Sequence, residues 1–258
     1  ELSLTTTTSE LLSFWTAPGV SLASLLSFTS GFDDEDNCMN RPGVDFATCV
    51  ELTYQASVGD ATAPGAVYQY SGSHMQIAGL MAMRATGAAS WSAIFAAWQA
   101  RTGMFPTGAY DLPSRTNPRL AGGMHWTGAE YLEFLRALRR GDLLTGTTRT
   151  AMLRNQRGTA TLTTSPAIAS WGEDWSYGFG NWLECSTATA APGSYDCGDA
   201  GERNSSAGAY GAYPVLDAEH GYVGVVARQG ALGSGEEGVG LFRAVDDLVA
   251  RWATRACP

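Results

Sequence analysis

Hydrophobic residues recur at helical spacing over most of the first 158 residues, with turns rich in Gly, Pro and Ser between the periodic stretches. Two stretches begin at residues suited to capping a helix. Asp45 is one, and Thr127, with Glu130 three residues later, forms a capping-box pattern. This part of the chain is expected to be mainly helical. The predicted helices cover residues 20–27, 45–57, 74–87, 90–100, 127–140 and 149–156.

The pattern changes after about residue 176, where short runs of aromatic and β-branched residues alternate with turns. Such runs predict strands over 177–183, 203–206, 211–216 and 222–228. Residues 239–256 follow as one amphipathic helix. Helices first, then an antiparallel meander with a covering C-terminal helix, indicate an α+β fold. The side of the last helix that is expected to pack carries Phe242, Val245, Leu248, Val249 and Trp252.

Composition and charge exclude several classes of function. No apolar run approaches the length of a membrane span. The net charge of −9 and the spread of acidic residues argue against a nucleic-acid partner. The one acidic run, 33–36, lacks the ligand order of a calcium loop, so a solvated loop is expected there. His74, His125 and His220 lie far apart without zinc-ligand spacing, so no metal and no cofactor are expected.

The cysteines form two close pairs and one single residue. Cys38 with Cys49 and Cys185 with Cys197 bracket loop-rich sequence and lack metal-type spacing. Two local disulfides and an oxidising compartment are expected, so the protein is expected to be secreted or periplasmic. Buried free thiols in a cytosolic protein are the alternative. The odd residue, Cys257, suggests pairing with something outside this sequence.

The most informative stretch is 67–87. A strand-like segment leads to Tyr70, a small polar run of Ser71, Gly72 and Ser73 follows, and then an apolar helix ends at Gly87. This order places a tyrosine hydroxyl on a tight loop at the start of a buried helix, which suits a fixed proton-transfer group. A core tyrosine with a satisfied hydroxyl is the structural alternative.

Five segments together resemble the serine β-lactamase-like superfamily of class C β-lactamases, D-alanyl-D-alanine carboxypeptidases and related esterases. They stand in the family's order at 22–32 (LASLLSFTSGF), 67–87, 117–138, 177–184 and 205–228, so the resemblance covers nearly the whole chain. It implies a β-lactamase-like fold, in which a helical lobe packs against an antiparallel sheet lobe with the active site in the crevice. The implied parts are 1–19, the end of the N-terminal part of the sheet lobe; 20–165, the helical lobe; and 166–258, the sheet lobe and C-terminal helix.

The resemblance also implies site residues. Tyr70 takes the place of the family's proton-transferring tyrosine, and the backbone N–H of Ala209 that of an oxyanion donor. Substrate binding falls to Gly72, where many members have Asn, and to Ser206 and Gly208 at the third motif. Ser206 stands where many members carry Lys or His, so the charge that binds a β-lactam carboxylate is missing, which favours an esterase or amidase. On spacing alone, residues 205–211 are an ordinary Gly/Ser hairpin.

The family's nucleophile comes from a Ser-x-x-Lys turn, and this sequence contains no lysine. The expected enzyme is a secreted serine hydrolase that cleaves a carboxylic ester or amide, in a small molecule or a polymer, through an acyl-serine. Its Ser and Lys would lie on an N-terminal piece of the same precursor, and a disulfide through Cys257 could hold that piece to this chain. A truncated sequence or a pseudo-enzyme would equally lack the motif. The alternative function is a catalytically silent member that binds a peptide, a cell-wall fragment or a small ester.

Overall fold

The computed structural model describes residues 2–32, 34–184 and 203–255. It divides into two compact units, one formed by residues 1–126 with 157–165 and the other by 127–156 with 166–258. These units do not coincide with the lobes expected from the sequence. The segment 127–156, expected in the helical lobe, belongs to the same unit as residues 166–258, which were expected to form the sheet lobe.

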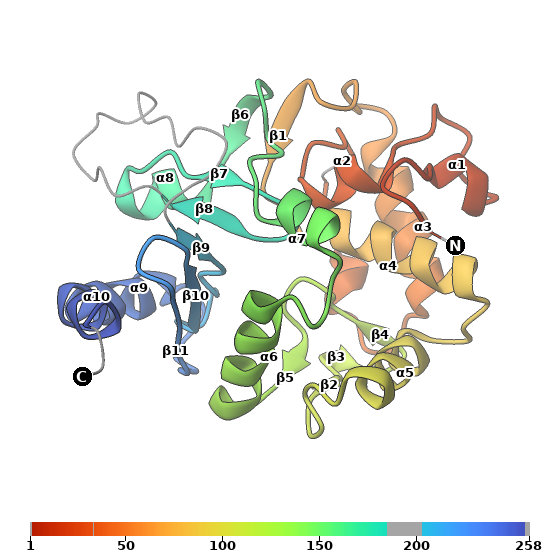
Figure 1. Cartoon of the computed structure of the whole chain (residues 1–258). Helices are drawn as coiled ribbons and strands as arrows, with labels where there is room; N and C mark the ends of the chain where they lie inside the picture. The colour runs from red at the N-terminus through yellow and green to blue at the C-terminus, as the bar shows by residue number, and fades with distance from the viewer. Residues whose placement is uncertain (1, 33, 185–202, 256–258) are drawn as a thin grey trace. The chain divides into compact units, whose positions relative to one another are not determined.

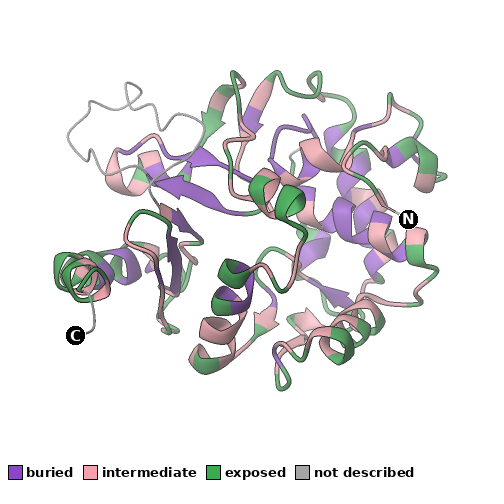
Figure 2. Ribbon diagram, in the orientation of Figure 1, coloured by how far each residue is buried: buried purple, intermediate pink, exposed green. Residues whose placement is uncertain are grey.

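The first unit is built around α4, which spans Ser73–Thr86 and is mostly buried (Figures 1 and 2). Four other helices pack against it. The predicted ends of α4 are confirmed, because Gly87 caps it in the left-handed conformation at φ 69°. The Asp45 cap is also confirmed, since its carboxylate accepts from the N–H groups of Ala47 and Thr48. The other helices are α1 Thr8–Leu11, α2 Leu22–Leu26, α3 Phe46–Ser57 and α5 Trp91–Thr102, with a 3-10 turn, η1, at Asn37–Asn40.

Three small strand pairs complete the first unit. The parallel pair of β1 and β6 matters for the site, because β1 leads directly into the loop that carries Tyr70. Hydrogen bonds from β6 hold β1 on one side. The other two pairs are antiparallel. The pairs are β1 Val67–Gln69 with β6 Thr161–Thr164, β2 Ala109–Tyr110 with β5 Met124–His125, and β3 Pro113–Ser114 with β4 Asn117–Pro118.

The second unit contains the antiparallel meander predicted from the sequence, in the order β11-β10-β9-β8-β7 (Figure 1). The segment predicted as one strand over 177–183 is instead a hairpin of β7 and β8, because the chain turns at Gly180 with φ 77°. The strands are β7 Ser176–Tyr177, β8 Trp182–Glu184, β9 Arg203–Ser205, β10 Tyr213–Asp217 and β11 Tyr222–Val226.

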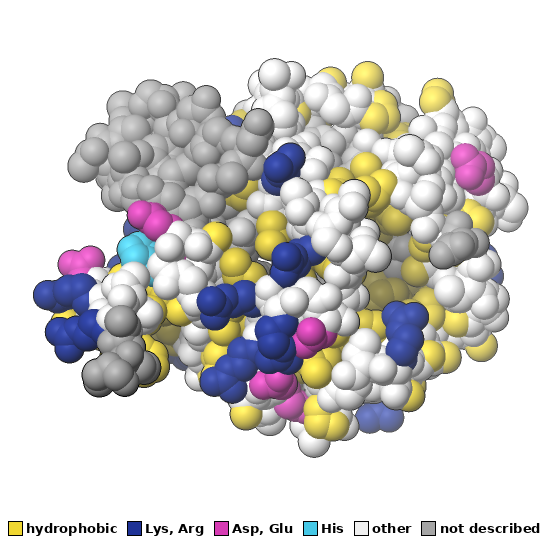
Figure 3. All heavy atoms as spheres, viewed as in Figure 1, with side chains coloured by type: hydrophobic (Ala, Val, Ile, Leu, Met, Phe, Trp, Pro, Cys, Tyr) yellow, Lys and Arg dark blue, Asp and Glu magenta, His cyan; other side chains and the backbone are white. Residues whose placement is uncertain are grey.

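Two helices cover opposite faces of this sheet. Both α6 (Gly128–Arg140) and α9 (Gly235–Arg243) contact β10 and β11. Because alternate residues of a strand face opposite sides of a sheet, the two helices contact different side chains of β10 and β11. The α6 capping box of Thr127 and Glu130 is confirmed. The solvent-exposed side of α6 carries the ion pairs of Glu133 with Arg136 and Arg140. Figure 3 shows acidic and basic side chains next to each other on this face. Two short helices, α7 Gly146–Met152 and α8 Pro166–Trp171, complete the unit.

The predicted single C-terminal helix is wrong. It is two helices, α9 and α10 (Asp246–Ala253), broken at Val245. Asp246 accepts from the Arg203 guanidinium at 2.6 Å and from the Tyr222 hydroxyl at 2.7 Å, so the chain bends to bring this carboxylate to the sheet. Of the expected packed face, Phe242 is buried. The exposed fractions of three others are high, at 44% for Val245, 61% for Leu248 and 76% for Trp252.

The disulfide between Cys38 and Cys49 is confirmed, with 5.4 Å between the two Cα atoms. It ties η1 to α3, and both cysteines are buried. The predicted partners Cys185 and Cys197, and Cys257, lie outside the described residues. Within the described ranges, no helix has the length and hydrophobicity needed to cross a membrane.

Candidate active site

The Tyr70 loop is held on both sides by backbone hydrogen bonds. The N–H of Tyr70 donates to the Thr164 carbonyl at 3.1 Å, and the N–H of Gln69 donates to the Phe28 carbonyl at 3.1 Å. The Tyr70 ring is half-buried and meets the Phe28 ring edge-on, with 5.1 Å between centroids. The loop expected from the sequence is therefore present, at the start of a buried helix.

Two effects raise the pKa of the Tyr70 phenol. Burial is the larger, and the nearby Glu35 carboxylate adds to it, because a negative charge disfavours the phenolate. The phenol is therefore protonated at neutral pH. A protonated phenol held in one place can pass a proton to a leaving group and regain one from water.

The acidic run was expected to be a solvated loop, and Asp34 and Glu35 are exposed, but Glu35 also makes two specific contacts that the sequence did not indicate. Its Oε1 accepts from the N–H of Gly72 at 2.5 Å, and its Oε2 lies 3.5 Å from Arg119 Nη2. Asp36 accepts from the N–H of Cys38 and caps η1. The run thus holds local structure, and Glu35 reaches the loop of the candidate tyrosine.

The predicted oxyanion donor lies in a tight turn after β9. The N–H of Gly208 donates to the Ala212 carbonyl at 2.8 Å, and the N–H of Gly211 donates back to the Gly208 carbonyl at 2.9 Å. The Gly208 carbonyl and the Ala209 N–H belong to one planar peptide group and point in opposite directions. The direction of the Ala209 N–H is therefore fixed, which a preorganised oxyanion donor requires.

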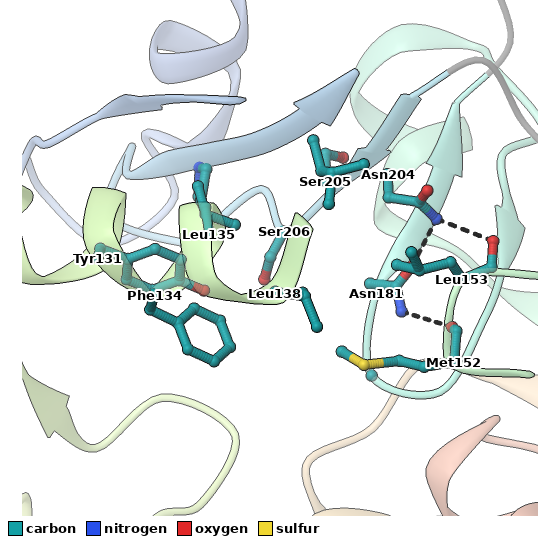
Figure 4. Close-up of a pocket in the computed structure, with 13 residues that line it drawn as sticks. Tyr131, Phe134, Leu135, Leu138, Met152, Leu153, Asn181, Asn204, Ser205 and Ser206 are labelled. Atoms are coloured by element: carbon teal, nitrogen blue, oxygen red, sulfur yellow. Dashed lines mark hydrogen bonds between the residues drawn. The ribbon is translucent and has the colours of Figure 1, made fainter. Parts of the chain in front are cut away.

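Ser206 opens onto a cavity of about 60 Å³ in the second unit (Figure 4). The apolar wall comes largely from α6, and among the described residues that line the cavity none is an Asp, Glu, Lys or Arg. Two asparagines in the wall of the cavity are hydrogen-bonded to each other: Asn204 Nδ2 donates to Asn181 Oδ1 at 2.8 Å. The α6 residues in the wall are Tyr131, Phe134, Leu135 and Leu138.

The structure groups the predicted site residues in two sets. Tyr70 and Gly72 lie on the same loop of the first unit, two residues apart. Ser206, Gly208 and Ala209 lie together in the second unit, between β9 and β10. Ser206 lines the cavity, while Gly208 and Ala209 form the turn beyond it.

No protein-family model and no curated protein matches this chain, but solved structures do. A candidate β-lactamase from Bacteroides dorei superposes with a TM-score of 0.74 at 24% identity, over 97% of this chain and 79% of that one. A penicillin-binding protein from Bacillus halodurans gives 0.68 at 19%, over 95% and 78%. D-amino acid amidase from Ochrobactrum anthropi gives 0.65 at 15%, over 97% and 84%.

The chain has the serine β-lactamase-like fold. In this chain with the β-lactamase-like fold, β9 leads directly to Ser206. A buried carboxylate that no sequence motif indicates anchors β9. Glu184 on β8 accepts from the hydroxyl of Ser205 and, at 2.6 Å, from that of Tyr213. Burial raises the pKa of Glu184, against the lowering effect of these hydrogen bonds and of Arg203 and Arg243. Alternation along β8 could have shown which face Glu184 occupies, but not its partners.

A buried histidine anchors the tyrosine side of the β-lactamase-like fold. The sequence favoured a structural or surface role for His74, and it is fully buried on α4. Its Nε2 lies 3.1 Å from the Gln69 carbonyl, which can only accept, so Nε2 carries the proton and Nδ1 accepts from Ser30 Oγ at 2.9 Å. Burial lowers its pKa from 6.5 to about 4, against the raising effect of the Gln69 hydrogen bond.

His74 should make folding sensitive to mild acid. As the pH falls below 6.5, the unfolded chain takes up a proton at this residue before the folded chain does. Its contribution to the unfolding free energy should fall by about 2 to 3 kcal/mol between pH 7 and 4.5. His74→Gln can keep both hydrogen bonds without titrating, so urea unfolding at both pH values should show a smaller loss in the variant. Equal losses would exclude this role.

Proposed function

We propose that the protein is a serine hydrolase that cleaves a carboxylic ester or amide through an acyl-serine. The observation that carries the proposal is a pair of preorganised groups. The Tyr70 hydroxyl sits on a fixed loop at the start of α4, and the Ala209 N–H has a fixed direction in the turn after β9. Solved structures with this fold include D-amino acid amidase from Ochrobactrum anthropi and a D-stereospecific amidohydrolase from Streptomyces, which supports the reaction class.

The chemistry assigns each group one task. The serine oxygen bonds to the substrate carbonyl carbon and gives its proton to the lysine, while the Ala209 N–H donates to the oxyanion that forms. When the C–O or C–N bond breaks, Tyr70 donates its proton to the departing alcohol or amine. Water then attacks the acyl carbon and gives a proton to the Tyr70 phenolate. The bond between the serine oxygen and the acyl carbon breaks, the lysine returns its proton to the serine oxygen, and the carboxylic acid is released.

The serine and lysine would lie on an N-terminal piece outside these 258 residues, because this sequence contains no lysine. The exposed apolar side chains of Val245, Leu248 and Trp252 support a partner on α10, since an uncovered apolar helix face favours association. A disulfide through Cys257 would keep such a piece attached. The Cys38–Cys49 disulfide supports a secreted or periplasmic protein.

The substrate would carry no carboxylate at the Ser206 end. Ser206 replaces the cation that many similar proteins place there. The cavity that it lines has a largely apolar wall with a few neutral polar groups, and none of the described lining residues is ionised. An anionic group there would lose its hydration without gaining a charged partner. This favours an esterase or amidase over an efficient β-lactamase, with Gly72, Ser206 and Gly208 as substrate-binding residues.

The missing lysine also favours a second candidate, a catalytically silent protein that binds a peptide, a cell-wall fragment or a small ester. Turnover of neutral esters by the full-length protein, before and after the exchange Tyr70→Phe, distinguishes the two. An enzyme loses most of its rate on this exchange, whereas a silent protein shows no turnover beyond the uncatalysed rate in either form.

A further inference from the structure

The carboxylate of Glu35 occupies the space into which a side chain at position 72 would point. A Cβ built on Gly72 would lie 2.8 Å from Glu35 Oε1, and the next neighbour, Ala121 Cβ, is 3.6 Å away. Gly72 has φ −70° and ψ −20°, which any L residue adopts. The backbone therefore does not require glycine at 72, whereas any larger side chain there would displace the Glu35 carboxylate from its present position.

The same carboxylate is tied to the loop. Its Oε1 accepts from the Gly72 N–H at 2.5 Å, and Oε2 lies 3.5 Å from Arg119 Nη2. Arg119 is shared, because its Nη1 donates to Asn40 Oδ1 at 2.9 Å. A side-chain amide at position 72, as in many proteins that this chain resembles, is thus replaced by an anion supplied from another loop.

The charge remains accessible and acts on the candidate tyrosine. The Glu35 side chain is 41% exposed, and its pairing with the half-exposed Arg119 is long, so Coulomb neutralisation is incomplete. The hydrogen bond from the Gly72 N–H, two residues after Tyr70, places the anion close to the proposed proton donor. A cationic group on a substrate would gain a partner there, and the net charge of −9 favours its approach.

We propose that Glu35 is a specificity-determining residue, whose carboxylate takes the place of a side chain at Gly72 and binds the ammonium group of an amino-acid amide or ester beside Tyr70. This inference rests on the proposed function and narrows its substrate class. Neither the Ser206 cavity nor the Gly72 loop offers an unshared cation among the described residues, which fits a substrate that carries a positive rather than a negative group.

The test measures binding, which needs no turnover. Titration calorimetry compares phenylalanine amide with N-acetyl-phenylalanine amide at about pH 6.5, where the free α-amino group is protonated. Wild-type full-length protein should bind the amine at least about tenfold more tightly, as expected for one charge-assisted contact. Glu35→Gln should remove this preference and leave the affinity for the N-acetyl compound unchanged. Asp60→Asn, an equal charge change at an exposed site on the same unit, should keep the preference.

The outcomes separate this inference from the proposed function. A preference that survives in Glu35→Gln, or wild-type protein without a preference or without binding, overturns the inference even where esters are turned over. A preference that Glu35→Gln removes supports it, whether or not turnover is seen. A separate measurement tests whether the Glu35 carboxylate occupies the space beside Gly72. The exchange Gly72→Ala should lower the melting temperature of the wild-type protein, and it should lower that of the Glu35→Ala variant by less. Equal losses would show that the carboxylate does not occupy this space.

Discussion

Tyr70→Phe is expected to lower the turnover of a neutral p-nitrophenyl ester by the full-length protein by a factor of about 10² to 10⁴. The exchange removes the only proton that the side chain can give to a leaving group. It keeps the ring and its edge-on contact with Phe28 at 5.1 Å, so the loop should remain in place. The measurement is kcat/KM together with the melting temperature, which should change little.

The matched control for this exchange is Tyr110→Phe. Tyr110 lies in the same unit, and burial raises the pKa of its phenol to about 12, but it packs between Trp91 and Phe95, away from the candidate loop. Its exchange should leave kcat/KM within a factor of about two. An unchanged rate in Tyr70→Phe would remove Tyr70 from the mechanism.

Ala209→Pro should cost about 10² to 10³ in kcat, the loss seen when one oxyanion donor is removed. Proline lacks the N–H, and the Ala209 carbonyl can still accept from the Gly233 N–H. The Ala209 side chain is exposed and contributes little packing, so loss of its methyl group should not change the rate.

Ala209→Gly is the control, because it keeps the N–H and removes only the methyl group. Its kcat should stay close to that of wild type. Melting temperatures of both variants separate a lost donor from a disturbed turn. A folded Ala209→Pro variant with a rate near that of wild type would show that this N–H does not stabilise the reaction.

The sequence was most informative where local signals agreed with periodicity. The Asp45 cap, the Thr127 and Glu130 capping box and Gly87 each mark a helix end within a residue or two, because these bonds join near neighbours. The antiparallel meander also followed from short strands and turns. The helix caps depend on contacts only a few residues apart.

Features that depend on distant partners were missed. The break before α10 arises because Asp246 bonds Arg203 and Tyr222, which lie 43 and 24 residues earlier in the chain. The contact of Glu35 with Gly72 spans 37 residues. In the sequence, nothing distinguishes Glu184 from other acidic residues of strands. Its role depends on the hydrogen bonds from Ser205 and Tyr213, which only the structure shows. A hydrophobic pattern tells which face is buried, but not which polar groups meet across it.

The roles of Tyr70, Gly72, Ser206, Gly208 and Ala209 stay predictions. The structure gives the local geometry of each, with Tyr70 and Gly72 on one loop and the other three between β9 and β10. Motif resemblance could point to these positions because their loops are short and fixed by the backbone. It could not show that glycine at 72 makes room for Glu35.

The most direct test of the account is to locate a covalent serine label. Protein from its native source is treated with a fluorophosphonate probe, and the labelled peptide is identified by mass spectrometry without and with reductant. The account predicts a label on the serine of a Ser-x-x-Lys sequence outside these 258 residues, held to this chain by a peptide bond or by a disulfide that the reductant opens. A label on a serine within these residues, or no label on folded protein, would contradict it.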